Sequence, residues 1–267
     1  MNSKFSTILF HFRFRYKKLK NELFNKTVIE QNKSFKNIPI IIISFNQLFY
    51  LKKLINFLLV NEYKNIVIID NNSTYKPLLH YFNEIEKVVK VYRLKENYGY
   101  RVFWNQNKLF AEYSNGYYVI TDPDIIPIKE CPSNFLQYFK WILDRNPQMD
   151  KVGFSLRIDN IPNSNPNKAK IIGWEKKYWI KTDNNGNYIS EIDTTFALYR
   201  PGKPFVSYKA IRSKYPYLAI HEGWYIDPKN LTKEQEYYFK TANESASWKM
   251  NPNGELVNKI FLNTYNK

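Results

Sequence analysis

The chain has 267 residues and 44% hydrophobic content, enough for one large domain with appendages and a buried core. Its formal net charge of +16 indicates an anionic partner, such as a nucleic acid, a membrane surface or a charged substrate. Most of the basic residues are lysines, whereas nucleic-acid grooves recruit arginine for base contacts, so the composition argues against a nucleic-acid partner.

The cysteine content and the hydropathy pattern limit where the protein works. Cys131 is the only cysteine, so one chain can form neither a disulfide framework nor a thiolate metal site. This favours a reducing compartment, and we expect a cytoplasmic protein. No uninterrupted apolar stretch of about 18 residues is present, so no segment is predicted to span a bilayer.

Residues 1–37 form a basic segment that differs from the rest of the chain. An apolar run over residues 5–14 is interrupted by charges and followed by the lysine-rich residues 16–20. A signal peptide would carry its charge before the apolar run. We expect a basic amphipathic helix, with residues 1–30 lying on an anionic membrane at its inner face. A helix packed on the domain with a solvated lysine face fits the sequence equally well.

From residue 38 onward, apolar runs typical of buried strands alternate with helical repeats. Each predicted strand ends in a polar loop. The predicted strands cover residues 39–44, 65–70, 88–94 and 117–120. The predicted helices cover residues 48–58 and 77–86, with a third that ends near residue 113. This alternation predicts an α/β fold with a mostly parallel sheet flanked by helices.

The second half of the chain carries weaker signals. A helix is expected over residues 132–145, strands over 151–157 and 191–200, and a further helix from about residue 232. Residues 158–187 are rich in Asn, Pro, Asp and Lys, which predicts an inserted loop with one short aromatic segment.

The apolar run that begins at residue 117 ends in two closely spaced carboxylates, Asp122 and Asp124, with Pro123 between them. In open α/β sheets, ligands bind at the carboxyl ends of the strands. Two carboxylates at this spacing repel each other unless a cation lies between them. The pattern therefore favours a divalent-cation site. The alternative is that Asp122 caps the next turn while Asp124 is solvated.

Four motifs occur in one order along the chain. They are residues 42–46, residues 69–74, Asn97-x-Gly99 followed by Asn105, and Asp122-Pro-Asp124. Together they resemble the inverting family 2 glycosyltransferases over roughly residues 38–128. The resemblance implies a Rossmann-like GT-A fold in which residues 38–130 bind a nucleotide sugar. Residues 131–267 would then bind the acceptor and form a C-terminal extension.

The resemblance also implies the reaction. We expect a hexose, UDP-linked in its donor, to pass to a hydroxyl of a glycan or of a lipid-linked acceptor, as in bacterial surface-polysaccharide assembly. Asn71 stands where the family often has an aspartate, which leaves the identity of the base open. The implied donor-binding residues are Ser44, Phe45, Asn46, Asp70, Asn71, Asn97, Arg101, Asn105 and Asp122.

Particular roles follow from the resemblance. Phe45 would stack on the base, Asp70 or Asn71 would bind its edge, and Arg101 would contact phosphate. Asp122, Asp124 and His221 would hold Mn²⁺ or Mg²⁺, which would neutralise the departing diphosphate. For His221, a hydrogen bond in the core or a turn cap is the alternative.

Inverting transfer needs a general base near the acceptor hydroxyl. The Glu-Asp pair that usually supplies it in the family is absent. Asp193 is the first candidate, because strand alternation would place it on one face with Glu191 at the site, and Glu222 is the second. A solvated loop carboxylate is the alternative for both. Glu175, between aromatic residues, could orient an acceptor sugar, although core packing explains those aromatics as well.

Two other function classes remain open. A metal-dependent nucleotidyltransferase would normally have a Gly- and Arg-rich phosphate loop after its first strand, and residues 44–48 lack one. A non-catalytic glycan-binding protein on a transferase scaffold has no need for the two aspartates.

Overall fold

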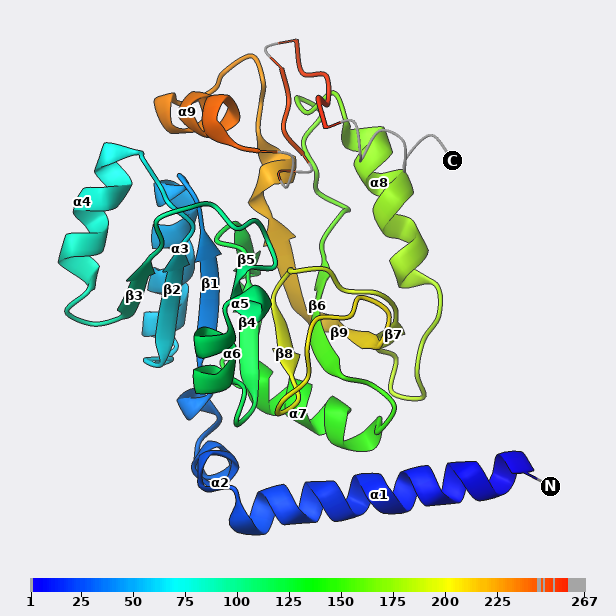
Figure 1. The fold of residues 1–267 in the computed structure, drawn as a ribbon. Coiled ribbons are helices and arrows are strands. Elements are labelled where there is room, and N and C mark those ends of the chain that lie inside the picture. The colour runs from blue at the N-terminus through cyan, green and yellow to red at the C-terminus, as the bar shows by residue number, and fades with distance from the viewer. Residues whose placement is uncertain (1, 244–245, 247, 252, 259–267) are drawn as a thin grey trace.

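The computed structural model describes residues 2–243, 246, 248–251 and 253–258. A nine-stranded mixed sheet forms its centre, in the order β3-β2-β1-β4-β8-β6-β9-β5, and β7 pairs with β9 (Figure 1). The predicted α/β class with a central sheet flanked by helices is confirmed.

The first half of the sheet is parallel, as the sequence predicts. Its strands are β1 (Ile40–Ser44), β2 (Ile66–Asp70), β3 (Lys90–Arg93) and β4 (Tyr118–Thr121). The connecting helices are α3 (Leu48–Val60), α4 (Lys76–Ile85), α5 (Val102–Asn105) and α6 (Asn107–Tyr113). Alternate residues of β1 enter hydrophobic clusters on opposite faces of the sheet, which explains why its sequence is apolar throughout.

The second half is largely antiparallel, and here the sequence predicts less. It contains β5 (Ile125–Pro127), α7 (Phe135–Arg145), β6 (Lys151–Leu156), β7 (Tyr188–Ile189), β8 (Ala197–Tyr199) and β9 (Ala210–His221). It also contains α8 (Lys168–Lys176), the 3-10 helices η2 (Lys177–Trp179) and η3 (Glu222–Tyr225), and α9 (Lys233–Thr241). Strand β8 lies antiparallel between β4 and β6, and β9 pairs antiparallel with β5.

Two expectations for this half are wrong, and one long strand was not expected. The strand expected over residues 191–200 is only the short β8, and the loop expected over 158–187 contains α8. Strand β9, which has twelve residues, was not predicted. Its middle is exposed at Lys214 and Tyr215 and its pairing with β6 shifts register, so it lacks the continuous apolar pattern of a fully buried strand.

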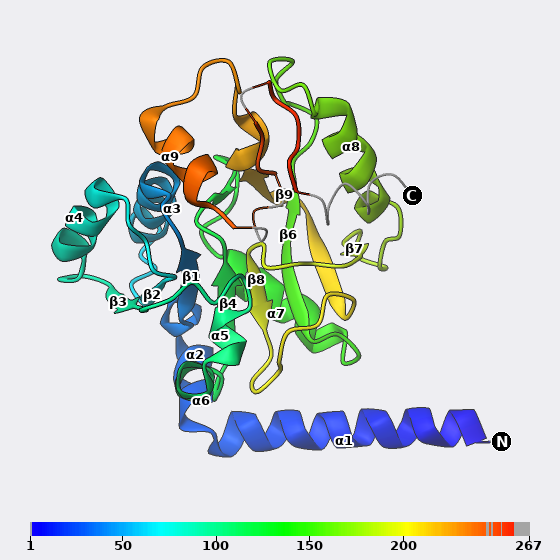
Figure 2. The ribbon, with the colours of Figure 1, turned by 45° about the horizontal axis from the view of Figure 1, so that its top comes forward.

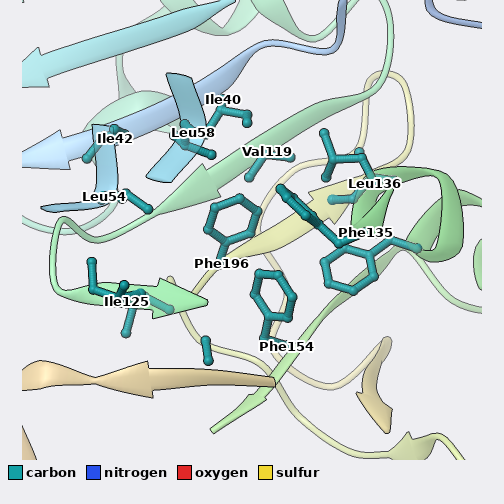
Figure 3. Packing of buried hydrophobic residues seen from close by; sticks show 14 of the residues in the cluster. Ile40, Ile42, Leu54, Leu58, Val119, Ile125, Phe135, Leu136, Phe154 and Phe196 are labelled. Carbon is teal, nitrogen blue, oxygen red and sulfur yellow. The ribbon is translucent and has the colours of Figure 1, made fainter. Parts of the chain in front are cut away.

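The core joins the two halves of the sheet. Phe135, Phe154 and Phe196 pack together beside Val119 of the first half, with ring centroids 5.1–5.6 Å apart (Figure 3). A Cβ atom at Gly153 would lie 2.3 Å from the carbonyl oxygen of Phe196, so glycine permits the close pairing of β6 with β8. The boundary expected near residue 130, between the donor-binding and acceptor-binding halves, stays a prediction. Residues on both sides of it belong to one hydrophobic cluster.

The amino-terminal segment is helical, as expected for a basic amphipathic helix. It comprises α1 (Asn2–Phe24), α2 (Lys26–Lys33) and the 3-10 helix η1 (Phe35–Asn37). Helix α1 lies at the end of the molecule opposite to α8 and α9 (Figure 1). None of the helices in the described residues combines the length and the apolarity that crossing a bilayer requires.

Candidate active site

A cavity of about 590 Å³ lies beyond the carboxyl ends of the parallel strands. The loops after β1, β2, β3 and β4 line it, together with residues 191–195, α8, the end of β9 and residues from α9 onward. Figure 2 looks toward this end of the molecule, with α9 and α8 on opposite sides. The location is that of ligand sites in open α/β sheets.

Most of the predicted site residues line this cavity, although they come from five separate loops and the end of β9. The lining residues are Phe45, Asn71, Asn97, Arg101, Asp122, Asp124, Asp193 and His221. The cavity-lining set does not include Ser44, Asn46, Asp70, Asn105 or Glu222.

Asn46 and Asp70 build the loops beneath the cavity. Asn46 has a positive φ of 51°, and its Oδ1 accepts hydrogen bonds from the backbone N–H groups of Thr74 and Tyr75. Asp70 Oδ1 accepts one from the backbone N–H of Ser73. The loops after β1 and β2 are therefore tied together by the residues expected to touch the donor.

Asn71 fixes the turn after β3. Its Nδ2 donates to the carbonyl oxygen of Gly99 at 3.0 Å, and its Oδ1 accepts from the backbone N–H of Tyr98 at 2.9 Å. Asn97 Oδ1 closes the same turn by accepting from the N–H of Gly99, which has a φ of 72°. An ionised aspartate at position 71 would offer no donor to the carbonyl of Gly99. These hydrogen bonds thus explain why an asparagine stands where the family often has an aspartate.

Ser44 and Asn105 lie apart from the cavity. Ser44 is fully buried at the end of β1, and its Oγ has no hydrogen-bond partner among the described atoms. Asn105 is an exposed residue at the end of α5. Arg101, by contrast, lies at the cavity with its guanidinium 5.0 Å from the ring of Phe205.

Asp122 and Asp124 follow β4 directly and are largely buried. Thr194 Oγ1 donates to Asp122 Oδ2 at 2.7 Å. Within the described residues, neither carboxylate forms an ion pair with a lysine or an arginine. Burial raises the pKa of both above the ordinary aspartate range, and the charge of Asp124 raises the pKa of Asp122 further.

His221 reaches the carboxylate pair from the end of β9, because antiparallel pairing places it opposite Ile125 of β5. Its Nδ1 lies 3.6 Å from Asp124 Oδ2 and has no hydrogen-bond partner in the described structure. The ring stacks on Trp224, with centroids 4.9 Å apart. Burial lowers the pKa of His221 to about 4, so the imidazole is neutral, as a metal ligand must be.

Gly223 keeps the space between these two groups open. A Cβ atom there would lie 3.1 Å from His221 Nδ1 and 3.3 Å from Asp124 Oδ2. A carboxylate oxygen and an unpartnered neutral imidazole nitrogen therefore face one small space, and both suit a divalent transition metal. Within the described residues, no group of three or more His, Cys, Asp or Glu side chains is arranged to hold a metal. An ion there would need further oxygen ligands from a substrate or water.

Asp193 also lines the cavity, but it does not lie on a strand. Residues 190–196 are irregular, so the strand-face argument for Glu191 and Asp193 is wrong. The Asp193 side chain is exposed toward the cavity, and the protein packed around it raises its pKa.

Lys151, which the sequence reasoning missed, holds this loop from below. It is fully buried, and its Nζ donates to the carbonyl oxygens of Ile192 at 2.6 Å and Asp193 at 3.2 Å. It also bonds Tyr199 Oη at 3.0 Å. Burial lowers the pKa of Lys151 to about 7, and its charge opposes the raised pKa of Asp193. The sequence signal that could have revealed Lys151 is a lysine at the first position of an otherwise apolar strand.

The remaining acidic candidates are already paired. Glu222 forms an ion pair with Lys53, and its backbone N–H donates to the carbonyl oxygen of Asp124 at 2.9 Å. Glu175 is buried in an ion pair with Arg212, whose Nε donates to the carbonyl oxygen of Glu191 at 2.7 Å. Glu175 therefore anchors α8 beside the cavity.

The family of the chain follows from its sequence match. Residues 40–200 match the model of glycosyl transferase family 2, which is more than half of the chain. The chain belongs to glycosyl transferase family 2. It is therefore a glycosyltransferase acting on a nucleotide-sugar donor, and the resemblance seen in its motifs is confirmed. No curated protein sequence matches the chain significantly.

Several solved structures are distantly similar, among them a mannosyltransferase, TarS and a cytidylyltransferase. A mannosyltransferase from Pyrobaculum calidifontis, in complex with GDP-Man and Mn²⁺, is 14% identical over 86% of this chain and 72% of its own, with a TM-score of 0.44. S. aureus TarS (1-349) is 13% identical over 79% and 74%, with a TM-score of 0.45. A Leptospira borgpetersenii cytidylyltransferase is 11% identical over 52% and 71%, with a TM-score of 0.33. Similarity at this level adds nothing to the family match.

The raised pKa values of Asp122 and Asp124 couple folding to proton uptake. The unfolded aspartates ionise near pH 4, whereas the folded pair holds its protons to higher pH, so stability contributed by the pair is lost as pH rises toward its folded pKa. Without divalent metal, we expect this contribution to the melting temperature to fall between about pH 6.5 and 8, above the titration of unfolded histidine. Asp122→Asn should flatten that fall in calorimetry with a chelator present.

Asp159→Asn is the matched control, because Arg157 holds the pKa of Asp159 below its usual range. It should leave the slope unchanged over this window. A slope in Asp122→Asn equal to that of the wild type would contradict the assignment of buried, proton-holding carboxylates.

Proposed function

We propose that the protein is a metal-dependent, inverting glycosyltransferase that transfers a hexose from a UDP-linked donor to a hydroxyl of a glycan or lipid-linked acceptor. One observation carries this proposal: Asp122, Asp124, His221 and Asp193 all line a single cavity. Surface-polysaccharide assembly is the process that such a reaction would serve.

The donor half of the cavity suits the parts of a nucleotide sugar. Phe45 and the turn fixed by Asn71 would bind the base, and Asp122 would accept a hydrogen bond from a ribose hydroxyl. Asp124 and His221 would hold Mn²⁺ or Mg²⁺, with Asp122 close by. The bound ion would supply positive charge to the diphosphate leaving group. Arg101 would add a second positive charge at the phosphates.

Asp193 would act as the general base. The acceptor oxygen would bond to the anomeric carbon while the bond from that carbon to the diphosphate breaks, and the acceptor proton would pass to the Asp193 carboxylate. Because the surrounding protein raises its pKa, the Asp193 carboxylate is a stronger base than an ordinary aspartate. Lys151 would keep the carboxylate in place through the two carbonyl groups it binds. Attack from the side opposite the leaving group would invert the anomeric configuration.

We also propose that the protein works in the cytoplasm, peripherally at the inner face of a membrane, through residues 1–30. The support is a helix of 23 residues that is rich in basic side chains. The lipid anchor of such an acceptor would then lie in the membrane to which the enzyme binds.

Incubation with a panel of nucleotide sugars and Mn²⁺ tests the reaction class. We expect release of nucleoside diphosphate from one donor, and a decrease of at least about a hundredfold in Asp124→Asn. Gly223→Ala should also weaken activation by Mn²⁺, because its Cβ crowds both His221 and Asp124. Gly173→Ala is the matched control, since a Cβ there meets nothing within 4 Å.

The same assay separates the alternatives. Release of pyrophosphate from a nucleoside triphosphate and a sugar phosphate would indicate a nucleotidyltransferase. Binding of glycans without turnover of any nucleotide sugar would indicate a non-catalytic protein. Activity equal in wild type and Asp124→Asn would remove the metal-binding role.

The assignment of the base predicts a difference between two carboxylates. Asp193→Asn should lower kcat by about a hundredfold to ten-thousandfold, because proton abstraction is lost while the amide keeps the shape of the side chain. Glu222→Gln should change kcat far less, since Glu222 is paired with Lys53 outside the cavity lining. The measurement is steady-state kinetics with the donor and acceptor found above. A larger loss in Glu222→Gln would reverse the assignment.

A further inference from the structure

Helix α1 carries an apolar stripe. Its exposed members are spaced three or four residues apart, which places them on one side of a helix. They are Ile8, Leu9, Phe12, Tyr16, Leu19 and Leu23. Phe12 is 69% exposed and Ile8 67%, so these side chains are largely open to solvent. Exposed apolar area of this kind marks a docking surface.

The opposite side of α1 contacts the body of the protein. The ring of Phe14 lies 4.7 Å from the guanidinium of Arg200, and Lys18 forms an ion pair with Asp144 at 3.3 Å. These contacts fix which side of the helix faces inward. The apolar stripe therefore points away from the body.

Basic residues border the stripe on both sides. Arg13, Lys17 and Lys20 follow one edge of it and Arg15 the other, and all four are exposed. The single acidic residue of α1, Glu22, is half-buried and lies 3.7 Å from Lys18 on the inward side. The apolar stripe thus lies between positive charges, and the exposed Phe10 and Phe24 lie beyond one basic edge.

This charge pattern decides between two occupants. In a helical dimer formed by a second copy, the residues that border the apolar seam face each other, so these basic borders would repel. An anionic bilayer accepts both features, because the apolar side chains enter the acyl boundary while lysine and arginine meet the lipid headgroups. We infer that α1 lies flat on an anionic membrane surface with this stripe inserted.

The fold then sets the direction in which the cavity faces. Arg200, the contact of α1, follows the strand residue Tyr199, which pairs with Tyr118 at the amino end of β4. Asp122 and the cavity lie at the carboxyl end of the same strand. Figure 1 shows α1 across one end of the molecule, with α8 and α9 at the other. With the stripe on the membrane, the cavity opens away from it.

This orientation limits which acceptors can reach the cavity. The inference about the acceptor rests on the proposed transferase function. A hydroxyl close to the bilayer would lie at the wrong end of the molecule. The acceptor that fits is the distal end of an extended glycan, with the lipid anchor, where there is one, separated from the reacting hydroxyl by several sugar units.

Sedimentation of the full chain with phosphatidylcholine vesicles, with or without phosphatidylglycerol, tests the docking. We expect binding that requires phosphatidylglycerol, weakens in high salt and falls at least tenfold in a Phe12→Ser, Leu19→Ser double variant. Ile180→Ser is the control, because Ile180 is 77% exposed but lies outside α1. Equal binding of wild type and double variant would overturn the inference. So would a dimer, without vesicle binding, that the double variant dissociates.

Two single-site labels test the orientation. An environment-sensitive fluorophore at Tyr16→Cys should shift to the blue on vesicles, whereas one at Tyr100→Cys on the cavity wall should not. The native Cys131 is buried. A shift at residue 100 would overturn the orientation. Release of nucleoside diphosphate without vesicles should be the same in wild type and in the double variant, so a failure of docking is distinguishable from a failure of the transferase assignment.

Discussion

Two largely buried carboxylates, which pair with no lysine or arginine in the described part of the chain, are the constraint on which the rest of this site depends. Burial of Asp122 and Asp124 disfavours their charged forms, and their proximity adds repulsion. In water such groups would simply be ionised. At the edge of this sheet they stay protonated up to an unusually high pH, or they share a cation. The raised pKa values therefore agree with the proposed site, in which a bound cation would complete the charge.

The two halves of the sheet contribute different parts of that site. The parallel half fixes Asp122 and Asp124 at the end of β4, and the loops after β1 and β2 are bonded to each other through Asn46. The antiparallel half brings His221 next to Asp124 through the pairing of β9 with β5. Lys151 anchors the Asp193 loop. Neither half alone assembles both the acidic pair and its partners.

Sequence reasoning was most successful where burial is simple. Strands β1, β2 and β4 are buried on both faces, so their apolar runs are continuous and their ends are visible as polar loops. Strand β9 alternates between buried and exposed stretches, and α8 lies in a polar segment, so neither produced a clear pattern. The strand expected around Asp193 failed because Lys151 and Arg212 bond the backbone carbonyls of residues 191–193 in place of a neighbouring strand.

The candidate site shows the same division. Four motif positions correctly predicted residues of the cavity, namely Asn71, Asn97, Asp122 and Asp124. The carboxyl ends of parallel strands meet at one edge of the sheet, so this prediction does not depend on side-chain direction. The split between residues that line the cavity and residues that support it could not be predicted. Asn46 and Asp70 occupy motif positions, yet their side chains form hydrogen bonds with backbone N–H groups of the loop after β2. That distinction depends on side-chain direction, which spacing in the sequence does not encode.

Calorimetric titration of Mn²⁺ into the protein with UDP present, in two buffers of different ionisation enthalpy, tests the central claim most directly. The two buffers report how many protons leave when the ion binds. The account requires proton release at neutral pH from carboxylates that burial keeps protonated, and the loss of both binding and release in Asp124→Asn. Binding without proton release, or binding that Asp124→Asn leaves intact, would contradict it.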